Sequence, residues 1–238
     1  MTYPSTSIGE TVILRDDFLG ASLNPAIAGT TENSGSGAIV VAQEGGVAGI
    51  ITGATSGNRS QLTTGLNHLP SSGSVLVQWR VKNVTAITTR ALFIGLTDTV
   101  ALENPIEISG TTFTYNATDA VGFVFDTAAT TDAWYVAGVA SGSGQNALLS
   151  LNGENVVPTA DVYENFMVEL TPEGDAVFSY GKDDGSTTTS GLKEIARISS
   201  AVTPSVLLTP VALIETRTSG ASTAYADALQ IGSGREMS

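Results

Sequence analysis

The feature that most constrains the fold is a strict two-residue alternation in residues 75–82. Apolar side chains occupy the odd positions of this segment, and Gln78, Arg80 and Lys82 occupy even positions between them. Successive side chains of a β-strand point to opposite faces, whereas a helix would not keep these three polar side chains on one side. The segment therefore predicts a half-buried antiparallel strand, with Trp79 on its core face.

The same alternation returns in residues 165–170, where Phe166 and Leu170 face one way. Pro172 and Gly174 follow where a hairpin loop of four or five residues needs them, and residues 176–180 form the returning strand. Further strands, separated by Gly, Ser, Thr, Asn and Pro clusters, are expected at residues 38–42, 47–52, 91–96, 120–126, 133–140, 147–151, 192–198, 205–215 and 222–231. Since no segment sustains a helical period, we predict an all-β chain of two packed antiparallel sheets.

A chain of 238 residues fits one large β-sandwich, and we find neither a long linker nor an internal repeat that would divide it. Hydrophobic residues make up 42% of the chain and charged residues only 14%, which favours a globular core over disorder. We therefore expect one domain over residues 11–231, with an N-terminal arm at residues 1–10 and a C-terminal tail at residues 232–238.

The charge balance excludes several classes of partner. Against 10 Lys plus Arg stand 23 Asp plus Glu, for a net charge of −13. Such a chain is repelled by phosphate backbones and anionic membranes, so we expect neither nucleic acid nor membrane as a partner.

The absence of cysteine removes disulfides and thiolate metal sites. Residues 1–10 contain no basic segment and no apolar run, so we expect no signal peptide and no membrane anchor.

Six segments follow one another in a familiar order: residues 16–20, 75–82, 93–98, 121–126, 134–138 and 224–231. In this order the chain resembles concanavalin A-like (laminin G-like) jelly-roll domains over residues 12–231. More narrowly, it resembles such domains among the virion structural proteins of tailed phages. These are strand-and-turn patterns rather than catalytic signatures, so they indicate the fold more specifically than the function.

The resemblance implies a non-enzymatic decoration (cement) protein that stabilises the capsid surface of a virion and is synthesised in the host cytoplasm. The implied partners are the major capsid protein and neighbouring copies of this chain, as a homotrimer by analogy. Tyr3, Pro4 and Ile8 of the arm are the candidate capsid contacts, and a merely frayed terminus is the alternative. The alternative function is a carbohydrate-binding or adhesion module on a virion or cell surface, and a glycan hydrolase ranks third.

The sequence offers no catalytic site. Some enzymes of related fold hydrolyse glycans with a Glu-x-Asp-x-x-Glu arrangement, which is absent here. The nearest acidic group consists of Asp98, Glu103 and Glu107. It straddles a turn and Pro105, as expected of a solvated acidic loop. His68 lies in a turn-like segment with no nucleophile elbow near it, so a surface or capping role is expected. We therefore predict no enzyme and no cofactor.

Calcium and glycan remain as candidate ligands. Asp98 and Glu103 are candidate calcium donors, with Asp16, Asp17 and Asp126 as further oxygen donors, although their spacing matches no dedicated calcium loop. We therefore expect no metal, with calcium as the alternative.

Trp134 and Tyr135 are the candidate glycan contacts. Because they are adjacent on a predicted strand they point to opposite faces, so only one of them is available at the surface. Core packing is the favoured role, and glycan contact is the alternative for whichever side chain faces the surface.

Overall fold

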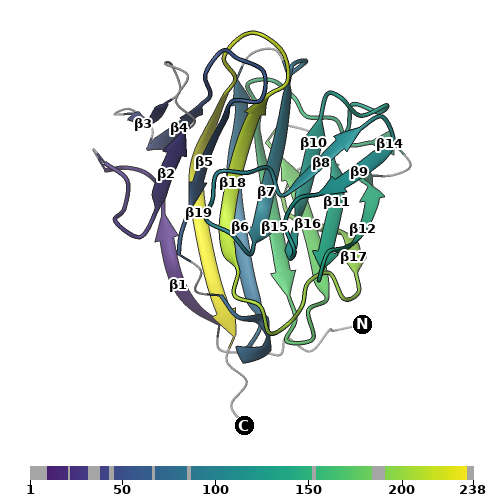
Figure 1. Cartoon of the computed structure of the whole chain (residues 1–238). Coiled ribbons are helices and arrows are strands. Elements are labelled where there is room, and N and C mark those ends of the chain that lie inside the picture. Colours follow the sequence, from purple (N-terminus) through teal and green to yellow (C-terminus); the bar gives the residue numbers. More distant parts are fainter. Residues whose placement is uncertain are drawn as a thin grey trace.

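The computed structural model describes residues 10–20, 22–31, 38–42, 46–65, 68–84, 87–151, 154–183 and 191–234. Within these residues two antiparallel sheets pack face to face (Figure 1), which confirms the predicted all-β sandwich. The one helical segment of the described chain is a 3-10 turn, η1 (Pro70–Ser72). In the same residues no helix has the length and apolar composition needed to cross a bilayer.

The first sheet, sheet A, is built around the alternating strand with which the sequence analysis begins. Its order is β17 (Lys193–Ile198), β16 (Ala176–Lys182), β15 (Tyr163–Leu170), β6 (Val75–Val84), β19 (Thr223–Gly234), β4 (Val47–Ile51) and β3 (Ala38–Ala42), with β1 (Glu10–Asp16) also paired to β19. The predicted hairpin is confirmed as β15 and β16, in which Leu170 pairs with Ala176.

The second sheet, sheet B, contains the more continuously apolar strands. Its order is β12 (Ser143–Leu148), β11 (Tyr135–Ala140), β10 (Ala120–Asp126), β7 (Arg90–Thr97), β18 (Thr209–Thr216), β5 (Arg59–Thr63) and β2 (Ala28–Thr31). Two short hairpins complete the fold: β8 (Ile106–Ser109) with β9 (Thr112–Tyr115), and β13 (Ser150–Leu151) with β14 (Glu154–Asn155).

The main core lies between the two sheets and is rich in aromatic rings. Trp79 is 1% exposed, as its place on the apolar face of β6 predicts. Phe166 of β15 lies at the centre of the aromatic group, with ring centroids 5.0 Å from Phe123, 4.7 Å from Trp134 and 5.6 Å from Tyr180. Edge-to-face contacts of this kind add to the free energy gained by burying the rings.

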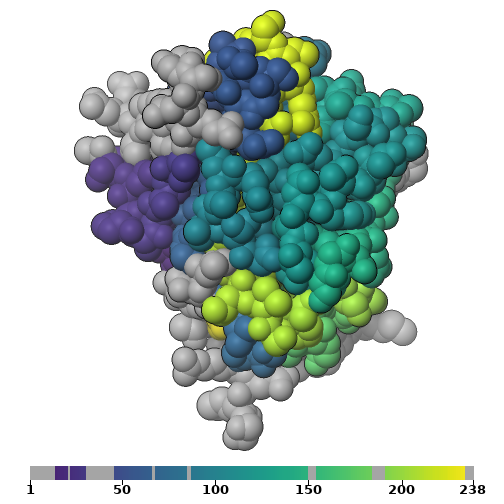
Figure 2. All heavy atoms as spheres, viewed as in Figure 1, coloured from purple at the N-terminus to yellow at the C-terminus, as the bar shows by residue number. Residues whose placement is uncertain are grey.

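A second apolar layer covers the outer face of sheet B. Ile106 and Ile108 of the β8–β9 hairpin are buried in one cluster with Phe93, Val124 and Leu213 of the sheet. Gly144 of β12 permits this closure, because a Cβ there would overlap the ring of Tyr115. Figure 2 shows one face of the molecule, on which atoms from the middle of the chain, coloured teal, cover the centre.

The β8–β9 hairpin corrects the prediction of a solvated acidic loop. Ile106 and Ile108 alternate with Glu107 and Ser109, so residues 106–109 are a half-buried strand rather than a loop. The strand expected at residues 147–151 is also displaced, because β12 ends at Leu148 and β13 begins at Ser150. At the ends of the sandwich Glu10 pairs with Gly234, so the paired strands extend beyond the expected limits of residues 11–231.

Candidate functional site

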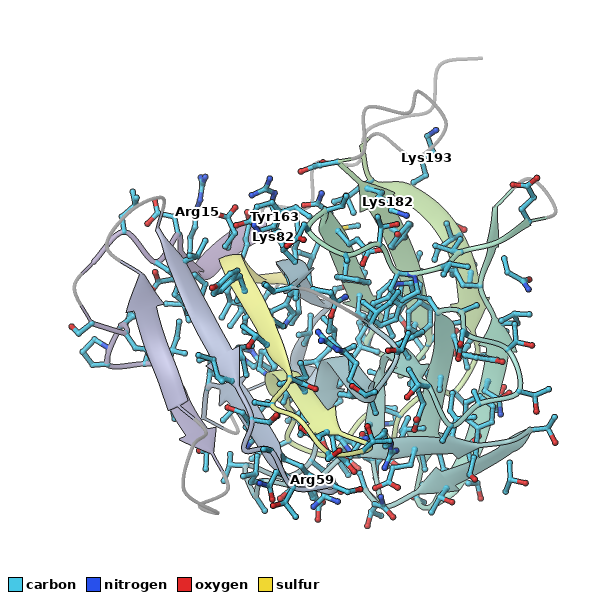
Figure 3. The ribbon with its side chains drawn as sticks, turned by 90° about the horizontal axis from the view of Figure 1, so that it is seen from above. Arg15, Arg59, Lys82, Tyr163, Lys182 and Lys193 are labelled. Atoms are coloured by element: carbon cyan, nitrogen blue, oxygen red, sulfur yellow. The ribbon has the colours of Figure 1, made fainter. Side chains whose placement is uncertain are left out.

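The outward side of β6, β15 and β19 forms a polar surface, which we call the sheet A face. Alternation places every second residue of these strands outside, and the antiparallel register brings them into rows. Its principal side chains are Gln78, Arg80, Lys82, Tyr163, Asn165, Tyr225, Asp227 and Gln230. Figure 3 shows Arg15, Lys82, Tyr163 and Lys182 on one side of the sandwich and Arg59 on the opposite side.

Two tyrosines flank a lysine on this face, an arrangement we call the tyrosine bracket. Lys82 pairs in register with Tyr163 of β15 and with Tyr225 of β19. Its Nζ lies 4.9 Å from the centroid of the Tyr163 ring and 5.5 Å from that of Tyr225. Both distances are within the range of cation–π attraction, which holds the ammonium between the rings.

Arg80 organises the carboxylates beside the bracket. Its guanidinium carbon lies 3.9 Å from the centroid of the Tyr163 ring. Its Nε and Nη2 donate to Oδ2 of Asp183 at 3.1 and 2.9 Å, and its Nη1 donates to Asp227. The register of β19 shifts between Ala226 and Ala228, a bulge that turns Asp227 toward Arg80. One guanidinium therefore fixes the two carboxylates and one ring.

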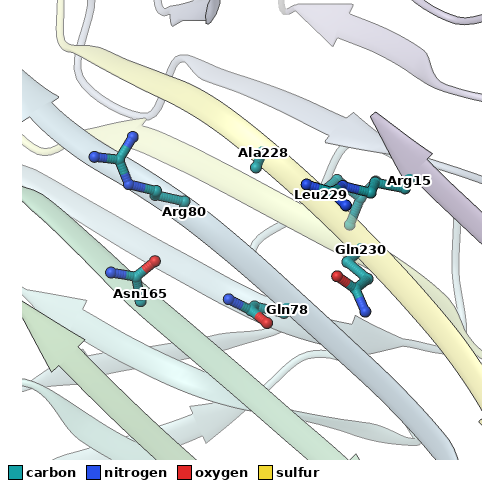
Figure 4. A pocket seen from close by; sticks show the side chains of 7 residues that line it. All are labelled: Arg15, Gln78, Arg80, Asn165, Ala228, Leu229 and Gln230. Carbon is teal, nitrogen blue, oxygen red and sulfur yellow. The ribbon is translucent and has the colours of Figure 1, made fainter. Parts of the chain in front are cut away.

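A shallow depression adjoins Arg80 on the side of β1. It encloses about 120 Å³. Its lining residues, shown in Figure 4, are Arg15, Gln78, Arg80, Asn165, Ala228, Leu229 and Gln230. Ala228 lies opposite Arg80, and its short side chain leaves room between the longer amides and guanidinium groups. The depression therefore presents both hydrogen-bond donors and acceptors to a ligand.

On the sheet A face, Tyr163 is neutral and Arg80 is charged. Burial, followed by the nearby Asp227 carboxylate, raises the pKa of Tyr163, so its phenol remains a hydrogen-bond donor at neutral pH. Burial lowers the pKa of Arg80, but the hydrogen bonds to Asp183 and Asp227 outweigh it and leave that pKa raised.

The two predicted glycan contacts lie elsewhere. Trp134 and Tyr135 point to opposite faces, as expected, but Trp134 is 0% exposed and its Nε1 donates to Glu164 Oε1 at 3.3 Å. Full burial removes Trp134 from the candidates for glycan contact. Tyr135 is partly exposed beside the β8–β9 hairpin, where its ring meets Phe113 edge-on at 5.5 Å. Glycan contact at Tyr135 stays a prediction.

The predicted calcium donors are not brought together. Asp98 Oδ2 accepts a hydrogen bond from the Asp119 amide at 3.0 Å, while Asp126 is bound to Arg217. No group of three or more carboxylate or imidazole side chains is placed to hold a metal ion within the residues that the structure describes. Calcium binding by Asp98 and Glu103 therefore stays a prediction, and no cluster of ligands among the described residues supports it.

Two further predictions concern His68 and the arm. His68 is 5% exposed and forms a bridge with Leu208, so the surface position expected from its turn-like sequence is corrected to a buried one. Burial lowers the pKa of His68 and favours the neutral imidazole. The candidate capsid contacts Tyr3, Pro4 and Ile8 lie outside the described residues.

A partly buried ionic group, which we call the arginine cluster, anchors the hairpin to sheet B. Arg217 donates from Nη1 to Glu215 at 2.7 Å and from Nε to Asp126 at 3.0 Å. Arg59 donates to Glu215 at 3.0 Å, and Glu107 of β8 lies 3.7 and 3.5 Å from Arg59 and Arg217. Because every carboxylate of this cluster is held by arginine, we assign it a structural role.

Glu164 is the one strongly perturbed carboxyl group of the described chain. Burial raises its pKa to about 7, although hydrogen bonds from Tyr180 and Trp134 oppose the shift. The side chain is 0% exposed, which rules out direct contact with a ligand in this structure. The sequence contained a signal for this group, because the period that places Phe166 inside also places Glu164 inside.

Comparison with known proteins establishes the fold of the chain. No family model and no curated protein matches the sequence. Among solved structures, the Emp47p carbohydrate recognition domain matches with a TM-score of 0.58 and 10% identity, over 96% of this chain and 96% of that chain. The chain has the concanavalin A-like jelly-roll fold.

Two other solved structures show how varied the proteins with this fold are. A Bacillus licheniformis beta-glucanase matches with a TM-score of 0.56 and 10% identity, over 92% of this chain and 96% of that chain. The CBM2 module of the evolved Dit of Lactobacillus casei BL23 phage J-1 matches with a TM-score of 0.55 and 16% identity, over 94% and 95%. At such identities the likeness establishes the fold and leaves function to the site itself.

Proposed function

We propose that this chain is a non-enzymatic carbohydrate-binding module, carried on a virion or a cell surface, and that the sheet A face binds the glycan. The observation that carries the proposal is the tyrosine bracket beside a depression lined by amides and guanidinium groups. Saccharides offer apolar C–H faces and many hydroxyl groups, so they require aromatic surface and polar groups in fixed positions together.

The polar groups of the face are held in place before any ligand arrives. Arg80 binds Asp183 and Asp227, and Asn165 Nδ2 donates to the other oxygen of Asp183 at 3.3 Å. Side chains that are already ordered lose less conformational entropy when a ligand binds. This arrangement supports recognition on a flat sheet without a deep cleft.

The same geometry argues for binding rather than hydrolysis. A glycosidase needs two carboxyl groups on either side of the scissile bond, one of them with a raised pKa. On the sheet A face, Asp183 and Asp227 are both bonded to Arg80, and the carboxyl with the raised pKa, Glu164, is fully buried. The proposal is therefore a module that binds glycan without cleaving it.

The virion setting rests on the sequence resemblance and on the phage Dit module among the structures of this fold. Capsid decoration, the major capsid protein as partner and a homotrimer remain predictions, and co-sedimentation with empty capsid shells would test them. Adhesion to a glycan fits the sheet A face more directly, because tyrosine rings and polar side chains lie side by side there.

A glycan array with wild-type protein and three alanine variants tests the proposal. Tyr163→Ala and Tyr225→Ala are each expected to weaken binding about two- to twelvefold, since an aromatic contact contributes about 0.5–1.5 kcal/mol. The matched control is Tyr135→Ala, a tyrosine of sheet B, which should bind as wild type. Binding lost only in Tyr135→Ala would move the site to β11, and no binding to any glycan would reject the proposed function.

A further inference from the structure

Among the described residues Lys82 forms no ion pair, whereas Arg80 engages both Asp183 and Asp227. The neighbours of the ammonium are instead the rings of Tyr163 and Tyr225. A ring face attracts the ammonium but accepts no conventional hydrogen bond from it, whereas a carboxylate would. The N–H groups of Lys82 therefore remain free to donate to a ligand.

The bracket lies among charges of both signs. Its cations are Lys82 and Arg80; Asp183 and Asp227 are both bonded to Arg80, and Asp161 lies two residues before Tyr163, with its amide bonded to the Asn83 carbonyl at 2.7 Å. The next outward carboxylate of β15, Glu169, is six residues beyond Tyr163, or about 20 Å along the strand. This distance exceeds the Debye length at physiological salt, about 8 Å, so the charge of Glu169 is screened from Lys82.

We propose that the glycan of the sheet A face is an acidic saccharide, and that Lys82 Nζ binds its carboxylate while a tyrosine of the bracket contacts the sugar ring. This inference rests on the proposed function and adds the class of sugar. Arg15 lies in the adjoining depression and supplies a second cation for a longer glycan. The net charge of −13 disfavours long polyanions, so the ligand carries isolated carboxylates rather than dense charge.

Pairs of glycans that differ only in the acidic group provide the test. The probes are methyl β-glucuronide with methyl β-glucoside, and methyl β-galacturonide with methyl β-galactoside, titrated at low ionic strength with NMR detection. In at least one pair the acidic member is expected to bind wild type about tenfold more tightly, the scale of one charge-assisted hydrogen bond. Added salt should reduce this preference, because the charge is exposed.

Lys82→Gln should abolish the preference by weakening binding of the acidic member of each pair more than that of its neutral partner, and Lys82→Arg should retain most of the preference. Lys182→Gln controls for the loss of a nearby lysine: Lys182 appears on the same side of the sandwich in Figure 3, but it pairs in register with the inward-facing Glu164 and donates to the Val157 carbonyl at 3.2 Å. Equal binding of both members of each pair, or a preference that survives Lys82→Gln, would overturn the acidic ligand and leave the proposed function standing. Failure of every glycan would reject both.

Discussion

Replacing Arg217 with methionine is expected to lower the free energy of unfolding by about 3–5 kcal/mol. Arg217 is the shared partner of Glu215, which is 2% exposed, and Asp126, which is 0% exposed. Methionine fills much of the same volume but leaves both buried carboxylates short of a counter-charge. Glu215 keeps Arg59, and Asp126 keeps backbone amides, which places the loss at the lower end of that range.

Urea denaturation at neutral pH measures this loss, with Arg197→Met as the matched control. Among the described residues Arg197 pairs with Glu194 alone, on an exposed stretch of β17, so its replacement should leave stability nearly unchanged. The double variant Arg217→Met/Asp126→Asn should recover part of the stability, because one unpaired charge is removed. Equal stabilities of the Arg217 and Arg197 variants would show that the arginine cluster does not hold the β8–β9 hairpin.

Glu164 is expected to make the protein less stable as the pH rises toward neutrality. Its pKa is about 7 in the folded chain and near the ordinary 4.5 when unfolded. Below pH 4.5 both states carry the proton, so Glu164 does not change the free energy of unfolding. Between these two values only the unfolded state releases the proton, and stability falls by about 1.4 kcal/mol per pH unit. By pH 8 the accumulated loss is about 3 kcal/mol.

Glu164→Gln isolates this effect, because glutamine keeps an acceptor oxygen for Tyr180 and Trp134 but does not titrate. Relative to wild type, the variant should gain about 2–3 kcal/mol on going from pH 4.5 to pH 8. Glu169→Gln is the control, since Glu169 lies on the same strand but faces outward. Stability curves of wild type and Glu164→Gln that run parallel across this range would contradict the assignment.

Local patterns predicted the strands whose two faces differ. Trp79 lies inside and Arg80 outside because the alternation of β6 is visible within a few residues. The β8–β9 hairpin was missed because Pro105 and the acidic residues near it look like loop chemistry. What makes residues 106–109 a strand is burial of Ile106 and Ile108 on a sheet that is distant in sequence.

The candidate site was only half accessible to sequence reasoning. Lys82 was placed on the polar side of its strand, but Tyr163 and Tyr225 reach it through pairings with β15 and β19, which lie far along the chain. No local pattern specifies that register. Trp134 illustrates the same limit, because alternation showed that it opposes Tyr135 but not which of the two faces the core.

The most direct test of the carbohydrate-binding account is to locate the ligand on the folded protein. Assigned amide resonances, followed while the best array glycan is added to wild type, report which strands it contacts. The account predicts that the largest shifts cluster on β6, β15 and β19, around Lys82, Tyr163 and Tyr225. Shifts confined to β11 and the β8–β9 hairpin would contradict it and assign the glycan to the opposite side of the sandwich.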